Sequence, residues 1–262
     1  MGETGSTGHL RRYVLSAAGL SAFFAAWASA SSFSQQTFLP GPTEVVRVFI
    51  LLLFEPFAGS TLLKHLASSL LRFFGGFSLA VFIGVPLGLC AGWSRKFDAL
   101  FTPLFESVRF ISPIAWVAFA ALWFGTGVGG PLLIIFAGAF PPCIINAYRG
   151  ARFVDERLVE AARTLGAGRI RVVFQVLLPA SIPSIVAGLR VAAGMGWQSL
   201  VGAELIVASS GIGFLMVQAQ SSVKTAIVMA GMAAIGLVGF SLDFALQRAE
   251  RVFCQKLRGQ SS

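Results

Sequence analysis

The chain has 262 residues, of which 56% are hydrophobic and only 12% are charged. Soluble domains carry about 25% charged residues, so the composition excludes an ordinary soluble domain and indicates a membrane protein with several spans. The net charge of +9 would favour nucleic-acid binding in a soluble protein, but the basic residues lie between the apolar runs, so no nucleic-acid partner is expected.

The N-terminal region begins with a Gly/Ser/Thr-rich stretch, which predicts a disordered tail over residues 1–12. Two arginines close that tail, and an apolar run over residues 13–33 follows them. We interpret the run as a retained first span. A cleaved signal peptide is the alternative, because the Ala-Ser-Ala sequence at 28–30 resembles a cleavage site.

Residues 34–65 form a mixed linker with one short apolar helix from Glu44 to Phe54. That helix has about 11 residues, whereas a span needs about 20. We therefore expect an amphipathic segment that lies on the membrane surface rather than crosses the membrane.

Residues 66–247 carry the remaining apolar runs and are expected to form one integral domain. The predicted spans are residues 66–93, a span centred on residues 113–124, and residues 131–148, 183–208 and 223–246; residues 97–111 are ambiguous. Small residues recur every four positions at Gly188, Ala192 and Gly196, a pattern that permits close helix contact in membranes. With the first run these segments give about six spans, so both termini lie on the same side.

Basic residues fix which side that is. They gather in the segments on the side of both termini, and Arg47, Lys64 and Lys224 are the clear exceptions. The positive-inside rule therefore places the termini, including residues 248–262, in the cytoplasm. It also places the polar loop at 150–180 there.

That loop has helical signals of its own. Asp155 can cap a helix that starts at Glu156, and Gly166 can end it in a left-handed conformation. Pro179 is expected to stop a second helical run. Four apolar residues share one face of the first helix: Leu158, Ala161, Ala162 and Leu165. Two interpretations fit this pattern: a docking surface for a soluble partner, and an ordinary loop helix.

The order of residues in this loop resembles the signature of binding-protein-dependent ABC importer permeases. The matching positions are Glu160-Ala161-Ala162, Gly166, Val176 and Leu178-Pro179. Val176 stands where the family more often has Ile, a difference of one methylene. Flanking sequences, such as Trp123-Phe124-Gly125-Thr126-Gly127 and Ala203-Glu204-Leu205-Ile206, are similar to the nitrate, sulfonate and taurine branch. The resemblance covers roughly Leu62 to Arg248.

The resemblance implies an all-α integral membrane protein of the type I ABC importer permease fold, acting as a homodimer in the bacterial inner membrane. Two ABC ATPase subunits would bind ATP, so this chain would need no cofactor. A periplasmic solute-binding protein would deliver a small solute, and the branch favours a small anion of the sulfonate, taurine or nitrate type. The implied ATPase-coupling residues are Asp155, Leu158, Glu160, Ala161, Ala162, Leu165 and Gly166.

Charged side chains within spans cost about 2.5–3.5 kcal/mol each, so each needs a partner or an aqueous lining. Arg190 and Glu204 are two such residues, and either a solute pathway or interhelical ion pairs would explain them. Arg109 is a third, although Glu106 three residues earlier can neutralise it. Trp123 and Trp197 complete the candidate pathway residues, with lipid-facing positions as the alternative.

No catalytic constellation, metal-ligand spacing or Walker sequence is visible, so the chain is expected to be a non-catalytic subunit. Two other classes were weighed. A secondary transporter would show an internal repeat and buried charge relays, and a membrane enzyme would need a catalytic set. Within the importer class, a neutral or cationic cargo such as a pyrimidine vitamin precursor is the alternative to an anion.

Overall fold

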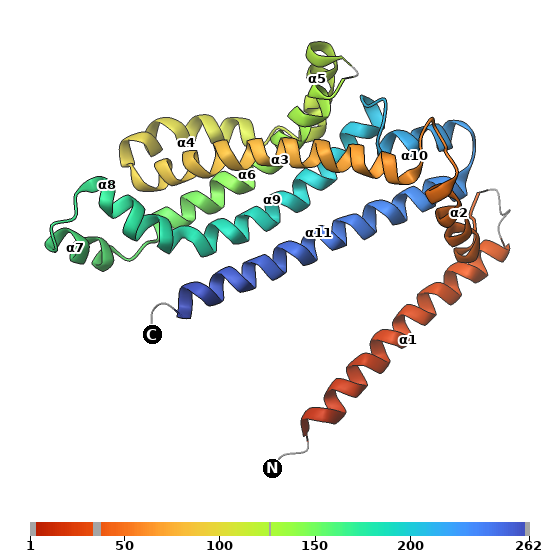
Figure 1. Cartoon of the computed structure of the whole chain (residues 1–262), viewed down its shortest axis with the longest axis horizontal. Helices are drawn as coiled ribbons and strands as arrows, with labels where there is room; N and C mark the ends of the chain where they lie inside the picture. The colour runs from red at the N-terminus through yellow and green to blue at the C-terminus, as the bar shows by residue number, and fades with distance from the viewer. Residues whose placement is uncertain (1–3, 34–37, 126, 260–262) are drawn as a thin grey trace. The chain divides into compact units, whose positions relative to one another are not determined.

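The computed structural model describes residues 4–33, 38–125 and 127–259, and these residues are almost entirely helical. Among the described residues, the extended backbone pairing consists of an isolated bridge between Phe57 and Ser60. The all-helical fold class expected from the sequence is therefore confirmed (Figure 1).

The helices follow one another with short connections. In chain order they are α1 (Thr4–Phe33), α2 (Pro42–Phe54), α3 (Leu62–Trp93), α4 (Arg95–Arg109), the 3-10 turn η1 (Pro113–Ala115), α5 (Trp116–Phe124), α6 (Gly129–Arg152), α7 (Glu156–Thr164), α8 (Arg169–Val172), the π-turn η2 (Val173–Leu177), α9 (Leu178–Ile206), α10 (Ile212–Ser221) and α11 (Thr225–Gly259).

Five of these segments are long and apolar enough to cross a membrane, and a bent pair brings the number to six if it counts as one span. The bent pair is α4 with Pro113–Phe124, which meet at 74°. The third span, predicted to be centred on residues 113–124, therefore corresponds to the second half of this bent pair, and the ambiguous residues before it form α4. Pro113 and the 3-10 turn break the helix, so the apolar length is divided between two short helices.

The expectation of a disordered N-terminal tail needs correction. The disordered tail expected over residues 1–12 is helical from Thr4 onward, because α1 extends toward the N-terminus and each added residue gains one hydrogen bond. Residues 1–3 lie outside the described part. The segment between the predicted spans 183–208 and 223–246 contains the ten-residue helix α10.

The chain divides into two compact units, Met1–Leu63 with Leu215–Ala233, and Lys64–Phe214 with Ala234–Ser262. In the first unit, the indole nitrogen of Trp27 donates to the carbonyl of Pro40 at 3.1 Å, and this bond ties α1 to the start of α2. The ammonium of Lys224 lies 5.1 Å from the ring centre of Phe57.

The second unit is built around α6, which contacts α3 on one side through glycine. A Cβ placed on Gly88 would lie 2.5 Å from the carbonyl oxygen of Ile144. A Cβ on Gly92 would lie 2.5 Å from the carbonyl oxygen of Tyr148. The two backbones are therefore in direct contact, as the small residues of α3 allow.

Helix α9 packs along α6 in the same way. Ala192 of α9 is fully buried with Ala139 and Cys143 of α6 and with Ala80 of α3. A Cβ on Gly196 would approach the Cβ of Ala139 to 3.3 Å. The small-residue pattern of α9 thus marks the place where the three helices meet, as expected from the sequence.

We expect Gly88→Ala to destabilise the protein by about 1–3 kcal/mol, because the new methyl group meets a backbone oxygen that cannot move aside. Gly194→Ala is the matched control, since nothing lies within 4 Å of a Cβ at that helical position. Thermal unfolding in detergent measures both. A Gly88→Ala protein as stable as the Gly194→Ala protein would show that α3 and α6 are not in backbone contact.

Candidate functional site: the loop helix and the buried charges

The loop helix α7 has well-defined ends. A carboxylate oxygen of Asp155 accepts a hydrogen bond from the N–H of Arg157 at 2.9 Å, which caps the first turn. At the other end Gly166 has φ +80°, and its N–H donates to the carbonyl of Arg163. The N–H of Ala167 donates to the carbonyl of Ala162. These two bonds form a Schellman motif, which requires the left-handed glycine.

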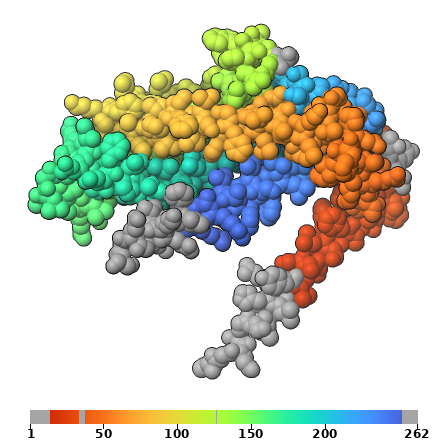
Figure 2. All heavy atoms as spheres, in the orientation of Figure 1, coloured from red at the N-terminus to blue at the C-terminus, as the bar shows by residue number. Residues whose placement is uncertain are grey.

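The apolar face of α7 points away from the rest of the chain. Leu158 is 52% exposed and Leu165 is 87% exposed, and Ala161 between them is exposed as well. Ala162 is partly buried, and no residue of α7 is fully buried. On the face seen in Figure 2, no other segment covers the α7–α8 region. A helix that keeps its leucines outward has an apolar surface left for a partner.

The opposite face of α7 carries Glu160, which lines a cavity with the ends of α3 and α6. Glu160 is therefore directed away from the exposed leucines. The seven predicted coupling residues thus divide between the caps, the outward face and the cavity.

The connection from α7 to α9 differs from the prediction that Pro179 stops a helix. Helices α8 and α9 are joined by the π-turn η2, and the N–H of Leu178 donates to the carbonyl of Val173, five residues earlier. Pro179 lies in the first turn of α9, where its missing N–H costs little. The wider turn accommodates the proline, so the helical path continues through the loop.

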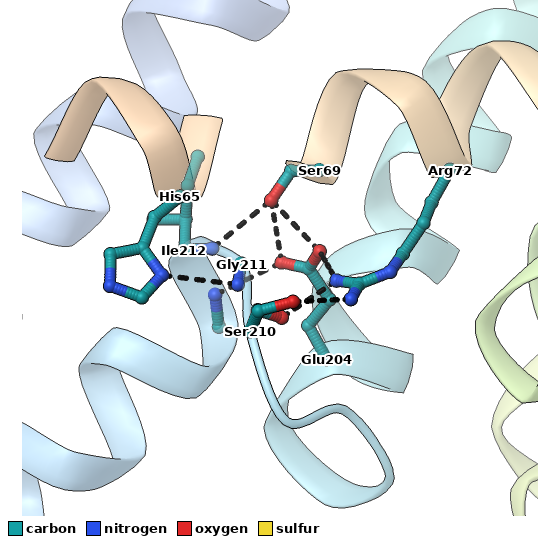
Figure 3. A network of polar contacts seen from close by, with 8 residues as sticks. His65, Ser69, Arg72, Glu204, Ser210, Gly211 and Ile212 are labelled. Atoms are coloured by element: carbon teal, nitrogen blue, oxygen red, sulfur yellow. Dashed lines mark hydrogen bonds and ion pairs between the residues drawn. The ribbon is translucent and has the colours of Figure 1, made fainter. Parts of the chain in front are cut away.

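The most buried charge of the second unit is the carboxylate of Glu204, near the end of α9. It is 1% exposed and pairs with Arg72 of α3, the Arg72 Nη1 to Glu204 Oε1 distance being 3.0 Å. The hydroxyl of Ser69 lies 2.8 Å from each carboxylate oxygen, and the N–H of Gly213 donates to the carboxylate at 3.1 Å (Figure 3).

The same network holds the turn between α9 and α10. Arg72 also donates to the carbonyl of Ser210 at 2.6 Å and to its hydroxyl. The N–H of Ile212 donates to the Ser69 hydroxyl, and the N–H of Gly211 donates to Nδ1 of His65. Every buried side-chain nitrogen and oxygen of the described residues has a hydrogen-bond partner. A buried ion pair is stable only when its remaining groups are satisfied in this way.

Sequence reasoning missed Arg72, which was not among the buried charges considered. A local signal was present, because His65, Ser69 and Arg72 are spaced i, i+4 and i+7 on an otherwise apolar helix. That spacing places three polar residues on one helical face, and such a face must meet polar groups elsewhere.

Arg190 is also paired rather than free. Its Nε lies 2.6 Å from one carboxylate oxygen of Asp243, and Nη2 lies 3.0 Å from the other. Glu250 is at 3.8 Å. This bidentate contact joins α9 to α11, and Asp243 is a second residue that sequence reasoning missed.

The other predicted pathway residues occupy two different environments. Arg109 pairs with Glu106 at 2.6 Å on the surface of α4, as their spacing indicated. Trp123 is 72% exposed. Trp197 is 6% exposed and its indole nitrogen donates to the carbonyl of Ile235. The structure therefore places Trp197 and Glu204 in the packing between helices and does not bring the five residues together. Their role in a pathway stays a prediction.

These features define a class: a membrane protein with several candidate spans and, on a loop between two of them, a short capped helix with exposed leucines. Residues 81–259 match the family described as binding-protein-dependent transport system inner membrane component. The chain is 35% identical over 215 residues to the taurine transport system permease protein of Escherichia coli (strain K12), covering 82% of this chain and 78% of that protein.

Two other similarities agree with that match. A bicarbonate transport system permease protein of Synechococcus elongatus is 34% identical, covering 88% of this chain and 85% of that protein. Among solved structures, an inward-facing conformation of the MetNI methionine ABC transporter superposes with a TM-score of 0.64 at 18% identity, covering 73% of this chain and 95% of that chain. This last similarity concerns the fold alone.

The chain belongs to the binding-protein-dependent ABC importer permeases, in the branch that includes the taurine and bicarbonate permeases. It is an inner membrane permease subunit of an ATP-driven importer, and its fold is that of the type I permeases. The relatives are transport permeases, which favours this class over the secondary transporter and the membrane enzyme.

We expect Glu204→Ala to cost about 3–5 kcal/mol of stability, because the variant leaves the Arg72 guanidinium buried without its partner. Glu106→Ala is the control, since it breaks a partly exposed pair with an expected cost of about 0–1 kcal/mol. Equilibrium unfolding in mixed micelles measures both. Equal small losses for the two variants would refute the buried network.

Proposed function

We propose that two copies of this chain form the pathway of an importer for a small anion. Two ABC ATPase subunits drive it from the cytoplasm, and a solute-binding protein delivers the cargo on the other side. ATP is bound and hydrolysed by the ATPases, so this chain acts without catalysis and without a cofactor of its own.

The outward face of α7 is the observation that carries the ATPase contact. Leu158, Ala161 and Leu165 are exposed on a helix whose ends are fixed by a cap and a Schellman motif. The alanine at the centre allows close approach, while the two leucines supply apolar area to bury. A rigid helix presented in this way suits insertion into a groove of a partner.

The position of α7 in the fold supports a role in transmitting force. Helix α6 ends at Arg152, three residues before the Asp155 cap, and α8 leads through the π-turn into α9. Helices α6 and α9 are packed along each other. Displacement of α7 by an ATPase would therefore act on both helices at once, which is what alternating access requires.

The distribution of basic residues supports the orientation. Arg149, Arg152, Arg169 and Arg171 lie near α7, at the ends of the spans that flank it. The positive-inside rule then assigns this end, and both termini, to the cytoplasm. The turn between α9 and α10 lies on the periplasmic side, where the solute-binding protein would dock.

A homodimer follows from the number of docking helices. One chain offers one helix of the α7 type, and an ABC transporter engages two ATPases. Two identical chains supply the two contacts by symmetry.

The cargo class rests on the relatives. The taurine and bicarbonate permeases are named for solutes that carry a sulfonate or a carboxylate-like anion. Arg190 does not supply the selectivity in this conformation, because Asp243 already occupies its guanidinium. Arg109 is likewise occupied, because its guanidinium pairs with Glu106. A neutral or cationic cargo remains the competing proposal.

We expect Ala161→Arg to abolish copurification of the ATPase, because a long charged side chain would hold α7 out of a close-fitting groove. Ala161→Ser is the control, because its side chain is small enough for the same approach. Both changes lie on an exposed surface, so the melting temperature should stay unchanged. Normal ATPase recovery with Ala161→Arg would exclude this docking face.

The cargo is tested in a strain of the source organism that lacks this chain. We expect the strain to lose uptake of radiolabelled taurine, an alkanesulfonate, nitrate or bicarbonate, and to regain it with the wild-type chain but not with Ala161→Arg. If the strain instead loses only the uptake of a labelled pyrimidine precursor, the cargo is the neutral or cationic alternative.

A further inference from the structure

A cavity of about 860 Å³ lies behind α7, on the side opposite its exposed leucines. Glu156, Val159, Glu160 and Arg163 line it from α7. These residues are spaced i, i+3, i+4 and i+7 and so occupy one helical face. The cavity is therefore distinct from the surface proposed for the ATPase.

The charges of this cavity are unbalanced. Its five cationic residues come from four elements: Arg95, Lys96, Arg152, Arg163 and Arg169. Two carboxylates, Glu156 and Glu160, share the lining. Within residues 14–251, apart from the gaps, none of these seven side chains forms an ion pair or a side-chain hydrogen bond with another. After the two carboxylates are counted, the lining of the cavity carries a net charge of about +3.

Two of these cations occupy positions where the local backbone disfavours positive charge. Arg95 and Lys96 are the first residues of α4, where the helix dipole disfavours positive charge. Free backbone N–H groups of that first turn also face the start of the helix. Ser94 caps the N–H of Phe97 and Asp98 lies in the same turn, so an anion would add to a stabilisation that the chain supplies in part.

The level of the cavity relative to the ends of the spans indicates which class of anion it binds. Trp93 and Arg152 are the last residues of two membrane-spanning segments, and Arg169 is the first residue of a third. All three line the cavity, so it lies where spans leave the membrane. Tryptophan and arginine are typical of that level, at which the phosphates of lipid headgroups lie.

We propose that this cavity binds the headgroup of an anionic phospholipid through its phosphodiester. Arginine recognises phosphate oxygens in pairs, and basic pockets between spans on the cytoplasmic side bind such headgroups. The bound headgroup would hold the α3–α4 turn, the end of α6 and the back of α7 in one arrangement. The proposal rests on the membrane orientation and not on ATPase docking.

The test uses the full chain in nanodiscs of phosphatidylcholine with phosphatidylglycerol, followed by native mass spectrometry in mild detergent. The cavity variant is Arg152→Gln with Arg163→Gln. The control variant is Arg157→Gln with Arg171→Gln, which removes the same charge from exposed positions outside the cavity. We expect the wild type and the control to retain phosphatidylglycerol. The cavity variant should retain at least about tenfold less phosphatidylglycerol. Each basic residue near a phosphate contributes a factor of roughly five in affinity, and the variant lacks two of them.

The other outcomes would overturn the proposal. Equal retention by all three proteins would show that the cavity holds no headgroup. Displacement of the lipid by millimolar inorganic phosphate would assign the site to a free anion. Loss of ATPase copurification by the cavity variant with lipid retention unchanged would make the cavity an ATPase contact. The Ala161→Arg variant leaves the cavity intact, so it tests ATPase docking independently of lipid binding.

Discussion

Direct contact between helix backbones is the constraint on which the second unit depends. Lipid gives apolar helices little reason to associate, so they must approach closely enough for dispersion forces to act. Gly88 and Gly92 of α3 admit the carbonyls of α6 at van der Waals distance, and Ala192 and Gly196 of α9 pack against small side chains of α6. Helix α6 is thereby held between two neighbours, and the loop helix α7 is attached to the ends of α6 and α9.

The buried charges complement this packing. An uncompensated charge inside the membrane is costly, and two ion pairs of the second unit, one buried and one partly exposed, join elements. Glu204 and Arg72 connect the end of α9 and the following turn to α3, while Arg190 and Asp243 connect α9 to α11. Helix α9 is consequently tied near its C-terminal end by Glu204 and near its middle by Arg190. A force applied to α7 at one end can therefore reach the turn at the other end through a single rigid element.

Local features of the chain could be predicted from the sequence. The Asp155 cap and the Gly166 termination depend on a few neighbouring residues, so the sequence pattern alone indicated them. The small-residue spacing of α9 was equally informative. The signature of the loop gave the family, which the similarity to permeases then established.

Features that depend on distant residues could not be predicted. Glu204 and Arg72 are separated by 132 residues, so the pairing appears only when α3 and α9 are placed together. The helix stop expected at Pro179 does not occur because a π-turn accommodates the ring, whereas the helix does break at Pro113. The composition of a helix does not distinguish these two outcomes, since the neighbouring packing decides between them.

The central claim is that the ATPase engages the outward face of α7 and not the cavity behind it. Site-specific photo-crosslinking measures this most directly, with a benzophenone side chain placed at Leu165 or at Arg163 in separate proteins. These positions lie on opposite faces of the same short helix. The account predicts a crosslink to an ABC ATPase from position 165 and none from position 163. A crosslink from position 163 alone, or from neither position in a transport-competent complex, would contradict it.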